Sequence, residues 1–101
     1  DPAWLSWSRL SSTITLSELY NKTLTLHNYN SHLSTAIAFS YGQLIPNLHY
    51  IELDLDDVKW KDAIVDRIPI VADGRLDLKV ESGWGVNPLI EEMRPYILYE
   101  Y

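Results

Sequence analysis

The pattern that most limits the folds open to this chain is a strand, a helix and a second strand within residues 23–56. Residues 23–29, TLTLHNY, alternate and contain β-branched residues, which favours a strand. Residues 48–56, LHYIELDLD, alternate again after a segment with helical spacing. Because two strands joined by a helix fit a right-handed crossover, we expect these strands to be parallel.

The helix of this unit is predicted from a single apolar stripe. The stripe residues recur at i, i+4, i+8 and i+11 with one alanine beside them: Leu33, Ile37, Tyr41, Leu44 and Ala36. Ser31 or Asn30 can cap the start of the helix, and Pro46 closes it. We therefore expect the stripe to face the core.

The remaining elements complete the predicted order β-α-β-α-β-β-α. Residues 56–66 form a short capped helix, and residues 68–81 form two strands around an Asp-Gly pair, which is a strong hairpin signal. Residues 86–93 begin a last helix with an asparagine cap and a proline in the first turn. The expected fold class is α/β, with a mixed four-stranded sheet and helices on both faces.

The two ends of the chain are rich in aromatic residues. We expect residues 1–20 to be an N-terminal arm and residues 21–101 to be the domain. Apolar residues that lie outside the predicted core form a candidate interface: Trp4, Trp7, Leu10, Tyr96, Tyr99 and Tyr101. Two alternatives remain: these ends fold back onto the domain, or they contact a protein partner or a second copy.

Composition excludes several classes of protein. The 101 residues suffice for one core, and the net charge of -6 opposes binding to nucleic acid. No apolar run is long enough to span a membrane. The absence of cysteine excludes disulfides, thiolate metal sites and cysteine nucleophiles. No secretory signal opens the sequence, so we expect a reducing intracellular compartment or organelle rather than secretion.

The order of elements and three short motifs resemble the glutaredoxin-like family of the thioredoxin fold, over roughly residues 23–93. Residues 31–34 match its Cys-His-Leu-Cys motif with serine at both cysteine positions: Ser31, His32, Leu33 and Ser34. Residues 52–57 are similar to its acidic turn, and residues 66–77 to its Arg-Val-Pro-Val strand and Asp-Gly hairpin.

The resemblance implies a cis Ile68–Pro69 bond that faces residues 31–34, whereas the residues alone favour a trans proline at a strand start. Ser31 and Ser34 keep the geometry of the motif but cannot exchange disulfides, because a hydroxyl does not ionise near neutral pH. The helix N-terminus would still attract an anion, which leaves a glutathione-like ligand as a weak possibility. The plain interpretation of Ser31 is a helix cap.

Other chemistry finds little support in the sequence. His27 and His49 would lie on neighbouring strands, but with His32 they show no regular metal-ligand spacing, so we expect isolated polar histidines and neither metal nor cofactor. A serine hydrolase is disfavoured, because no G-x-S-x-G elbow is present. The acidic run at residues 54–57 is interpreted as a helix cap with solvated charge.

The sequence alone therefore predicts a non-catalytic thioredoxin-fold binding or structural module, a subunit of a larger assembly. The alternative is a thiol-disulfide oxidoreductase whose active-site cysteines are substituted by serine.

Overall fold

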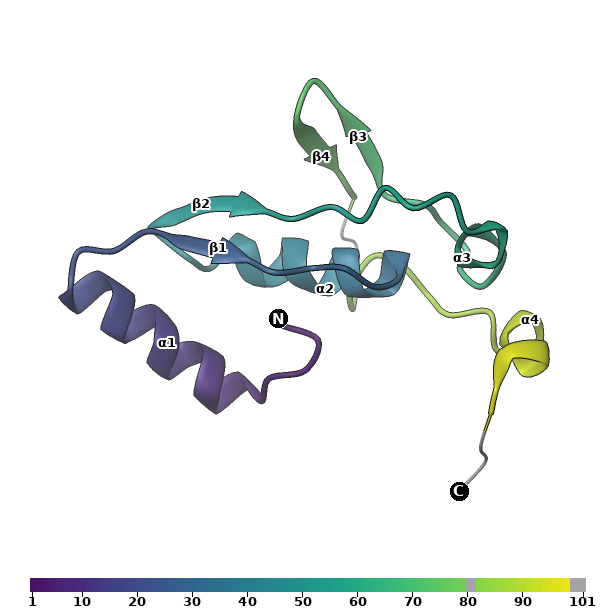
Figure 1. Cartoon of the computed structure of the whole chain (residues 1–101), viewed down its shortest axis with the longest axis horizontal. Coiled ribbons are helices and arrows are strands. Elements are labelled where there is room, and N and C mark those ends of the chain that lie inside the picture. Colours follow the sequence, from purple (N-terminus) through teal and green to yellow (C-terminus); the bar gives the residue numbers. More distant parts are fainter. Residues whose placement is uncertain (80–81, 99–101) are drawn as a thin grey trace.

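The computed structural model describes residues 1–79 and 82–98, and its first half is a helix followed by a strand–helix–strand unit. The elements are α1 (Trp7–Leu19), β1 (Leu24–Leu26), α2 (His32–Gly42) and β2 (Leu48–Ile51). β1 and β2 pair in parallel, with a register shift between Leu24 and Thr25, and α2 lies along them (Figure 1). The predicted parallel pairing of these two strands is confirmed.

The second half is made of short elements. They are α3 (Lys59–Ala63), β3 (Ile70–Ala72), β4 (Arg75–Asp77), α4 (Ile90–Met93) and a 3₁₀ turn, η1 (Arg94–Tyr96). β3 and β4 form the predicted antiparallel hairpin, and both turn residues, Asp73 and Gly74, have positive φ angles of 51° and 70°. Two successive positive φ values are the requirement of the type I′ turn that Asp-Gly favours.

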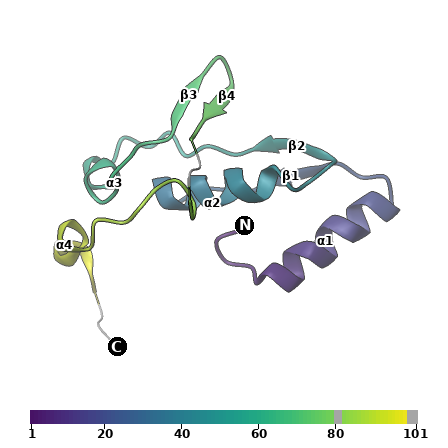
Figure 2. The ribbon, with the colours of Figure 1, turned by 180° about the vertical axis from the view of Figure 1, so that it is seen from behind.

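The predicted four-stranded sheet is wrong, because the structure holds two separate two-stranded sheets. Viewed from either side, the hairpin projects from the β1–β2 layer, opposite to α1 (Figures 1 and 2). The segment after α3 pairs with the segment before α4 instead of joining a sheet. The Asp66 N–H donates to the Asn87 carbonyl, and the Leu89 N–H donates to the Ile64 carbonyl. Val65 and Pro88 form an isolated bridge there, so the helix predicted from residue 86 begins only at Ile90.

Two small apolar clusters form the core. The first joins α1, β1 and α2 and the turn after it, through Leu10, Ile14, Leu26, Ala38 and Ile45. The second joins α2 to the segments that follow α3 and β4, through Ala36, Ile64, Val65, Leu78 and Val86. Because both clusters include an alanine of α2, this helix is the element that connects the two halves.

The buried face of α2 differs from the predicted stripe. Its buried residues are small, namely Ser34, Thr35, Ala36, Ala38 and Gly42, while Leu44 beyond its end is 60% exposed. A Cβ at Gly42 would lie 2.9 Å from Ile51 Cδ1, which is closer than such contacts normally come. Close approach of the helix to β2 thus selects small side chains on the inner face.

The N-terminal residues contribute to the core. Leu10 is 3% exposed and belongs to the first cluster, which corrects its assignment to an exposed interface. Trp7 stacks on Tyr41 with ring centroids 5.4 Å apart, whereas Trp4 is 77% exposed. At the other end, Tyr96 lies near Trp60. Tyr99 and Tyr101 lie outside the described residues, and the interface role of the exposed aromatics stays a prediction.

The predicted cis bond is also wrong: among the described residues every peptide bond is trans, including Ile68–Pro69. Pro69 immediately precedes β3, a place where a strand tolerates the missing N–H. No helix of the described part is both long and apolar enough to cross a bilayer.

Candidate functional site

The carboxyl ends of β1 and β2 bring polar side chains together. His27 and Asn28 directly follow β1, and Glu52 directly follows β2. The strands are parallel and paired at Leu26 and Ile51, so their next residues leave the sheet at the same edge. In open and closed parallel sheets this edge is where ligands bind.

His27 lies between two carboxylates. Its Nδ1 is 3.3 Å from Asp1 Oδ2, and its Nε2 is 3.5 Å from Glu52 Oε2. Both ring nitrogens face carboxylates, which only accept hydrogen bonds, and the contact with Asp1 is the shorter of the two. The Asp1 side chain is 14% exposed and the His27 side chain 63%, so the imidazole reaches solvent from an oriented position. This arrangement resembles the paired acid and histidine of general acid–base catalysis.

Asn28 holds Glu52 and the end of β1 in place through its hydrogen bonds. Its N–H donates to Glu52 Oε2 at 2.9 Å, and its side-chain amide donates to the Glu52 carbonyl at 3.1 Å. The same amide donates to Thr35 Oγ1 of α2 at 2.9 Å. Asn28 is fully buried, so these bonds hold both strand ends against the helix from the inside, while the Glu52 side chain stays 43% exposed.

A second polar cluster lies beyond the same edge. Lys61 Nζ is 2.9 Å from Asp54 Oδ2 and donates to the Asp56 carbonyl at 3.1 Å. Its hydrogen bond with Lys61 holds the pKa of Asp54 below the usual range. Tyr29 donates its hydroxyl to Asp56, which raises the tyrosine pKa. The interpretation of residues 54–57 as solvated charge is wrong for Asp54, whose side chain is 9% exposed.

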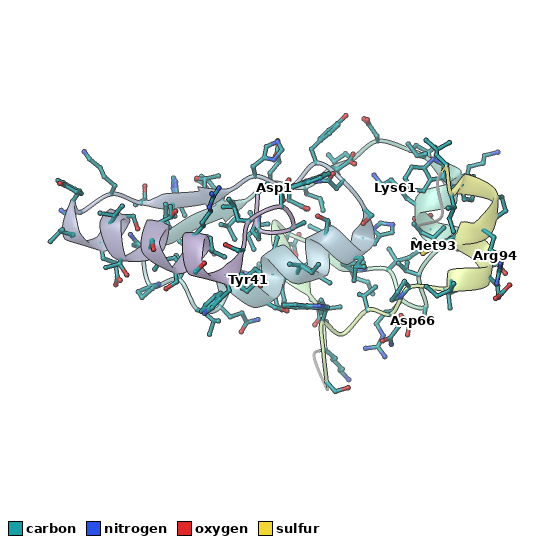
Figure 3. The ribbon with its side chains drawn as sticks, turned by 90° about the horizontal axis from the view of Figure 1, so that it is seen from below. Asp1, Tyr41, Lys61, Asp66, Met93 and Arg94 are labelled. Atoms are coloured by element: carbon teal, nitrogen blue, oxygen red, sulfur yellow. The ribbon has the colours of Figure 1, made fainter. Side chains whose placement is uncertain are left out.

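A histidine contact joins the start of α2 to α3. Figure 3 labels Asp1 near the middle of the molecule and Lys61 within α3. His32 Nε2 at the start of α2 is 2.6 Å from Asp62 Oδ1 of α3, so His32 joins the two helices. Among the described residues no group of three or more histidine, cysteine, aspartate or glutamate side chains is arranged to hold a metal ion.

The residues of the predicted Ser-His-Leu-Ser site fall into different roles. Ser31 is the N-cap of α2 and accepts from the Ser34 N–H at 3.3 Å, which confirms the helix-cap interpretation. Ile68, by contrast, lines a cavity beside the hairpin with Arg67 and Leu78 and does not face Ser31. The structure therefore does not bring together the site that a glutaredoxin-like protein would have.

Sequence reasoning named His27 only as an isolated histidine and did not name Asp1 or Glu52 as site residues. The signal that points to two of them is positional: His27 and Glu52 directly follow the two strands whose parallel pairing the sequence predicts. Asp1 has no such signal, because its contact with His27 spans 26 positions and depends on how α1 packs.

Comparison with known proteins gives one structural likeness. No protein-family model and no curated protein matches the sequence. Two solved structures of a "putative L-alanine-DL-glutamate epimerase" from Burkholderia xenovorans strain LB400, one bound to magnesium and fumarate, match with a TM-score of 0.78 and 26% identity. The match covers 83% of this chain and 21% of that one, so this chain spans about a fifth of that protein's length.

This likeness overturns the resemblance to glutaredoxins. The matched structures are named as epimerases, not thiol-disulfide oxidoreductases, and most of this chain shares its fold with part of such a protein. The thioredoxin-fold binding module and the cysteine-substituted oxidoreductase are therefore both wrong. The order of elements misled the prediction, since the thioredoxin fold and this chain both contain a strand–helix–strand unit followed by a hairpin.

Proposed function

We propose that this chain is part of a larger enzyme domain that moves a proton at a carbon next to a carboxylate, as an epimerase does. The observation that carries the proposal is the Asp1–His27 pair at the carboxyl end of two parallel strands. The likeness to an epimerase at 26% identity supports it.

The geometry assigns a role to each group. We assign the ring proton to Nδ1, which faces Asp1; Nε2 then takes a proton from a carbon acid that displaces the Glu52 carboxylate, 3.5 Å from this nitrogen. Asp1 orients the ring and stabilises the imidazolium that forms, as the third group of such sites does. Glu52, held by the Asn28 N–H, lies where it contacts either the ring or the bound acid.

Magnesium is bound in one of the matched structures, and this chain does not supply a site for it within its described residues. Asp1 and Glu52 lie on opposite sides of His27 and engage its two nitrogens, which leaves no convergent set of oxygen ligands. The proposal therefore derives no step through a metal.

Hydrogen exchange at the α-carbon tests the proposal. Because this chain would be one part of the enzyme, the complete polypeptide is incubated with L-alanyl-L-glutamate in deuterium oxide, and loss of the α-proton signal is followed by NMR. His27→Asn should slow exchange about 10²–10⁴-fold, the usual contribution of a general base. The matched control is His49→Asn, since His49 is an exposed histidine on β2 away from Asp1.

Equal exchange by the His27→Asn and control variants would overturn the role of His27. A protein that exchanges no α-proton on dipeptides or on other small carboxylic acids would overturn the proposal as a whole. A protein partner or self-association, and a reducing intracellular compartment, stay predictions from the sequence.

A further inference from the structure

The imidazole of His27 contacts two carboxylates, and the segment that follows β1 hydrogen-bonds each of them. Glu52 Oε2, 3.5 Å from His27 Nε2, accepts from the Asn28 N–H at 2.9 Å. Asp1 Oδ2, 3.3 Å from His27 Nδ1, accepts from the Asn30 side-chain amide at 3.0 Å. On each side, the oxygen that faces the ring also accepts the second hydrogen bond. The short segment after β1 therefore places both carboxylates around its own histidine.

The two carboxylates are not held equally. The Asp1 side chain is 14% exposed, and its Oδ1 also accepts from the Ala3 N–H at 3.0 Å. The Glu52 side chain is 43% exposed, and besides its contact with His27 it accepts only from the Asn28 N–H among the described residues. Because Glu52 has fewer donors and more contact with water, a ligand displaces it from the ring more readily than Asp1.

The Asn30 amide is available for Asp1 because another residue caps α2. The sequence allows either Asn30 or Ser31 as the helix cap, and the structure uses Ser31, whose Oγ accepts from the Ser34 N–H. Asn30 immediately precedes this cap, so its backbone is fixed at the start of the helix. Since a carboxylate only accepts hydrogen bonds, the NH₂ group of the amide faces Asp1. Asn30 thus connects the start of α2 to the N-terminal turn.

We propose that Asn30 is a positioning residue that makes Asp1, rather than Glu52, the fixed partner of His27. By holding Asp1 Oδ2 against Nδ1, the Asn30 amide keeps the ring proton on Nδ1 and leaves Nε2 to take a proton. Without this bond Asp1 loses one of its donors, and Glu52 competes for the ring proton through Nε2. The effect on catalysis rests on the proposed function, whereas the effect on the ring proton does not.

Contacts elsewhere hold α1 in place, so the loss of the Asn30 amide should act locally. Leu10 is buried in the first apolar cluster, and Trp7 stacks on an aromatic ring of α2. Neither contact involves the Asp1 carboxylate. Within the described part of the chain, His27 and Asn30 are the only side chains that hydrogen-bond this carboxylate. A substitution of Asn30 therefore changes the environment of the ring without removing the packing of α1.

The test measures which nitrogen of His27 carries the proton. The complete polypeptide is labelled with ¹⁵N at its histidine rings, and the nitrogen shifts are recorded at about pH 8.5, where an ordinary histidine is neutral. The spectrum of His27→Asn identifies the two resonances that belong to His27. In the parent protein we expect a protonated Nδ1 and an unprotonated Nε2. In Asn30→Ala the two shifts should move toward each other, because the two nitrogens then share the proton.

Asn87→Ala is the matched control. The Asn87 side-chain amide donates to Asp66 Oδ2 at 2.8 Å, which is the same kind of bond between the segments that follow α3 and precede α4. This variant should show the His27 shifts of the parent protein. Unchanged His27 shifts in Asn30→Ala would overturn the proposal. If thermal unfolding shows that Asn30→Ala is not folded, Asn30→Asp decides, because it keeps the size of the side chain and replaces the donor with an acceptor.

The two proposals fail separately. In the α-proton exchange assay Asn30→Ala should be about 10- to 100-fold slower, because a misplacement of about 1 Å can cost about 10²-fold. If no α-proton exchanges but the His27 shifts change in Asn30→Ala, the positioning role stands and the epimerase-type function is wrong. If His27→Asn slows exchange while Asn30→Ala alters neither rate nor shifts, the acid–base role stands and the positioning role is wrong. Changed shifts with an unchanged rate would overturn the part of Asn30 in catalysis.

Discussion

The strand–helix–strand unit of residues 24–51 and the β3–β4 hairpin are both made of short strands, but they are held together differently. In the first, Leu26 is 5% exposed and packs with residues of α1 and α2 that are distant in sequence. In the hairpin, all three residues of β3 are exposed, and Ile70 is 65% exposed. The parallel pair therefore depends on burial, and the hairpin on its turn.

This difference agrees with the place of the proposed site. The buried unit fixes the positions of two strand ends relative to one another, so it can hold His27 next to Glu52. A hairpin anchored at its base through Leu78 cannot position side chains at its tip with the same accuracy. The residues assigned to catalysis accordingly come from the first region and from Asp1.

The largest expected effect comes from a substitution in the buried strand–helix–strand unit of residues 24–51. Leu26→Ala should lower the free energy of unfolding by about 2–5 kcal/mol, through lost burial and a cavity between α1 and α2. Denaturant unfolding followed by tryptophan fluorescence measures it. The matched control is Ile70→Ala on β3, which should cost less than about 0.5 kcal/mol because the side chain is exposed. Similar losses for the two variants would contradict the contrast between the regions.

The next effect concerns the Asp54–Lys61 pair, which joins the segment after β2 to α3 and lies outside both regions. Asp54→Asn should cost about 1–3 kcal/mol, because it leaves a buried ammonium with only the Asp56 carbonyl. Urea unfolding at neutral pH measures the loss. If the variant is as stable as the parent protein, the Asp54–Lys61 pair contributes nothing to the free energy of unfolding.

The same pair predicts the sign of an acid effect. Folding lowers the pKa of Asp54, so its contribution is present above the pKa of the unfolded chain and is lost as the pH falls through the folded value. The free energy of unfolding should therefore fall with acid below about pH 4, near the ordinary aspartate pKa. In Asp54→Asn that fall should be shallower, which unfolding curves between pH 2 and pH 6 would show.

A smaller effect tests the turn. Gly74→Ala should destabilise the hairpin by about 1 kcal/mol, since its φ of 70° is unfavourable for a side chain although no atom lies within 4 Å. Hydrogen exchange of the β3 and β4 amides measures local opening. An unchanged exchange rate would show that the hairpin is held by contacts other than its turn.

The smallest effect lies on the surface of α4 and η1, outside both regions. Arg94 donates to Glu91 in an exposed i,i+3 pair, with nitrogen–oxygen distances of 2.7 and 3.2 Å. Arg94→Ala should lower stability by only about 0.2–0.5 kcal/mol, and salt should reduce even that difference. Thermal unfolding at low and at high salt checks both statements, and a larger loss would place Arg94 in a contact beyond this pair.

The sequence predicts local elements better than their assembly. Asp73 and Gly74 specify a turn whatever surrounds them, and Ser31 caps a helix through a neighbour three residues away, so both features are predictable. The buried face of α2 is not, because Gly42 and Ala38 are selected by the distance to β2, which a helical pattern does not encode. The four-stranded sheet failed for the same reason, since residues 64–66 pair with residues 87–89 instead.

The site shows the same limit. His27 and Glu52 can be placed at neighbouring strand ends from their positions in the sequence, but Asp1 joins them only through the path of α1 and its packing on Leu26. Residues 31–34 match a motif through the identity of their side chains, whereas topology brings together His27 and Glu52, which directly follow two paired strands.

The proposed base role of the single histidine between Asp1 and Glu52 has a stereochemical consequence. A base fixed by its Nδ1 hydrogen bond approaches a planar carbanion from one face only, and any proton it returns arrives on that same face. Working alone, His27 would exchange the α-hydrogen of one enantiomer with retention of configuration. Inversion requires a second proton donor on the opposite face, so on this geometry the two hands of the substrate would be handled by different parts of the enzyme.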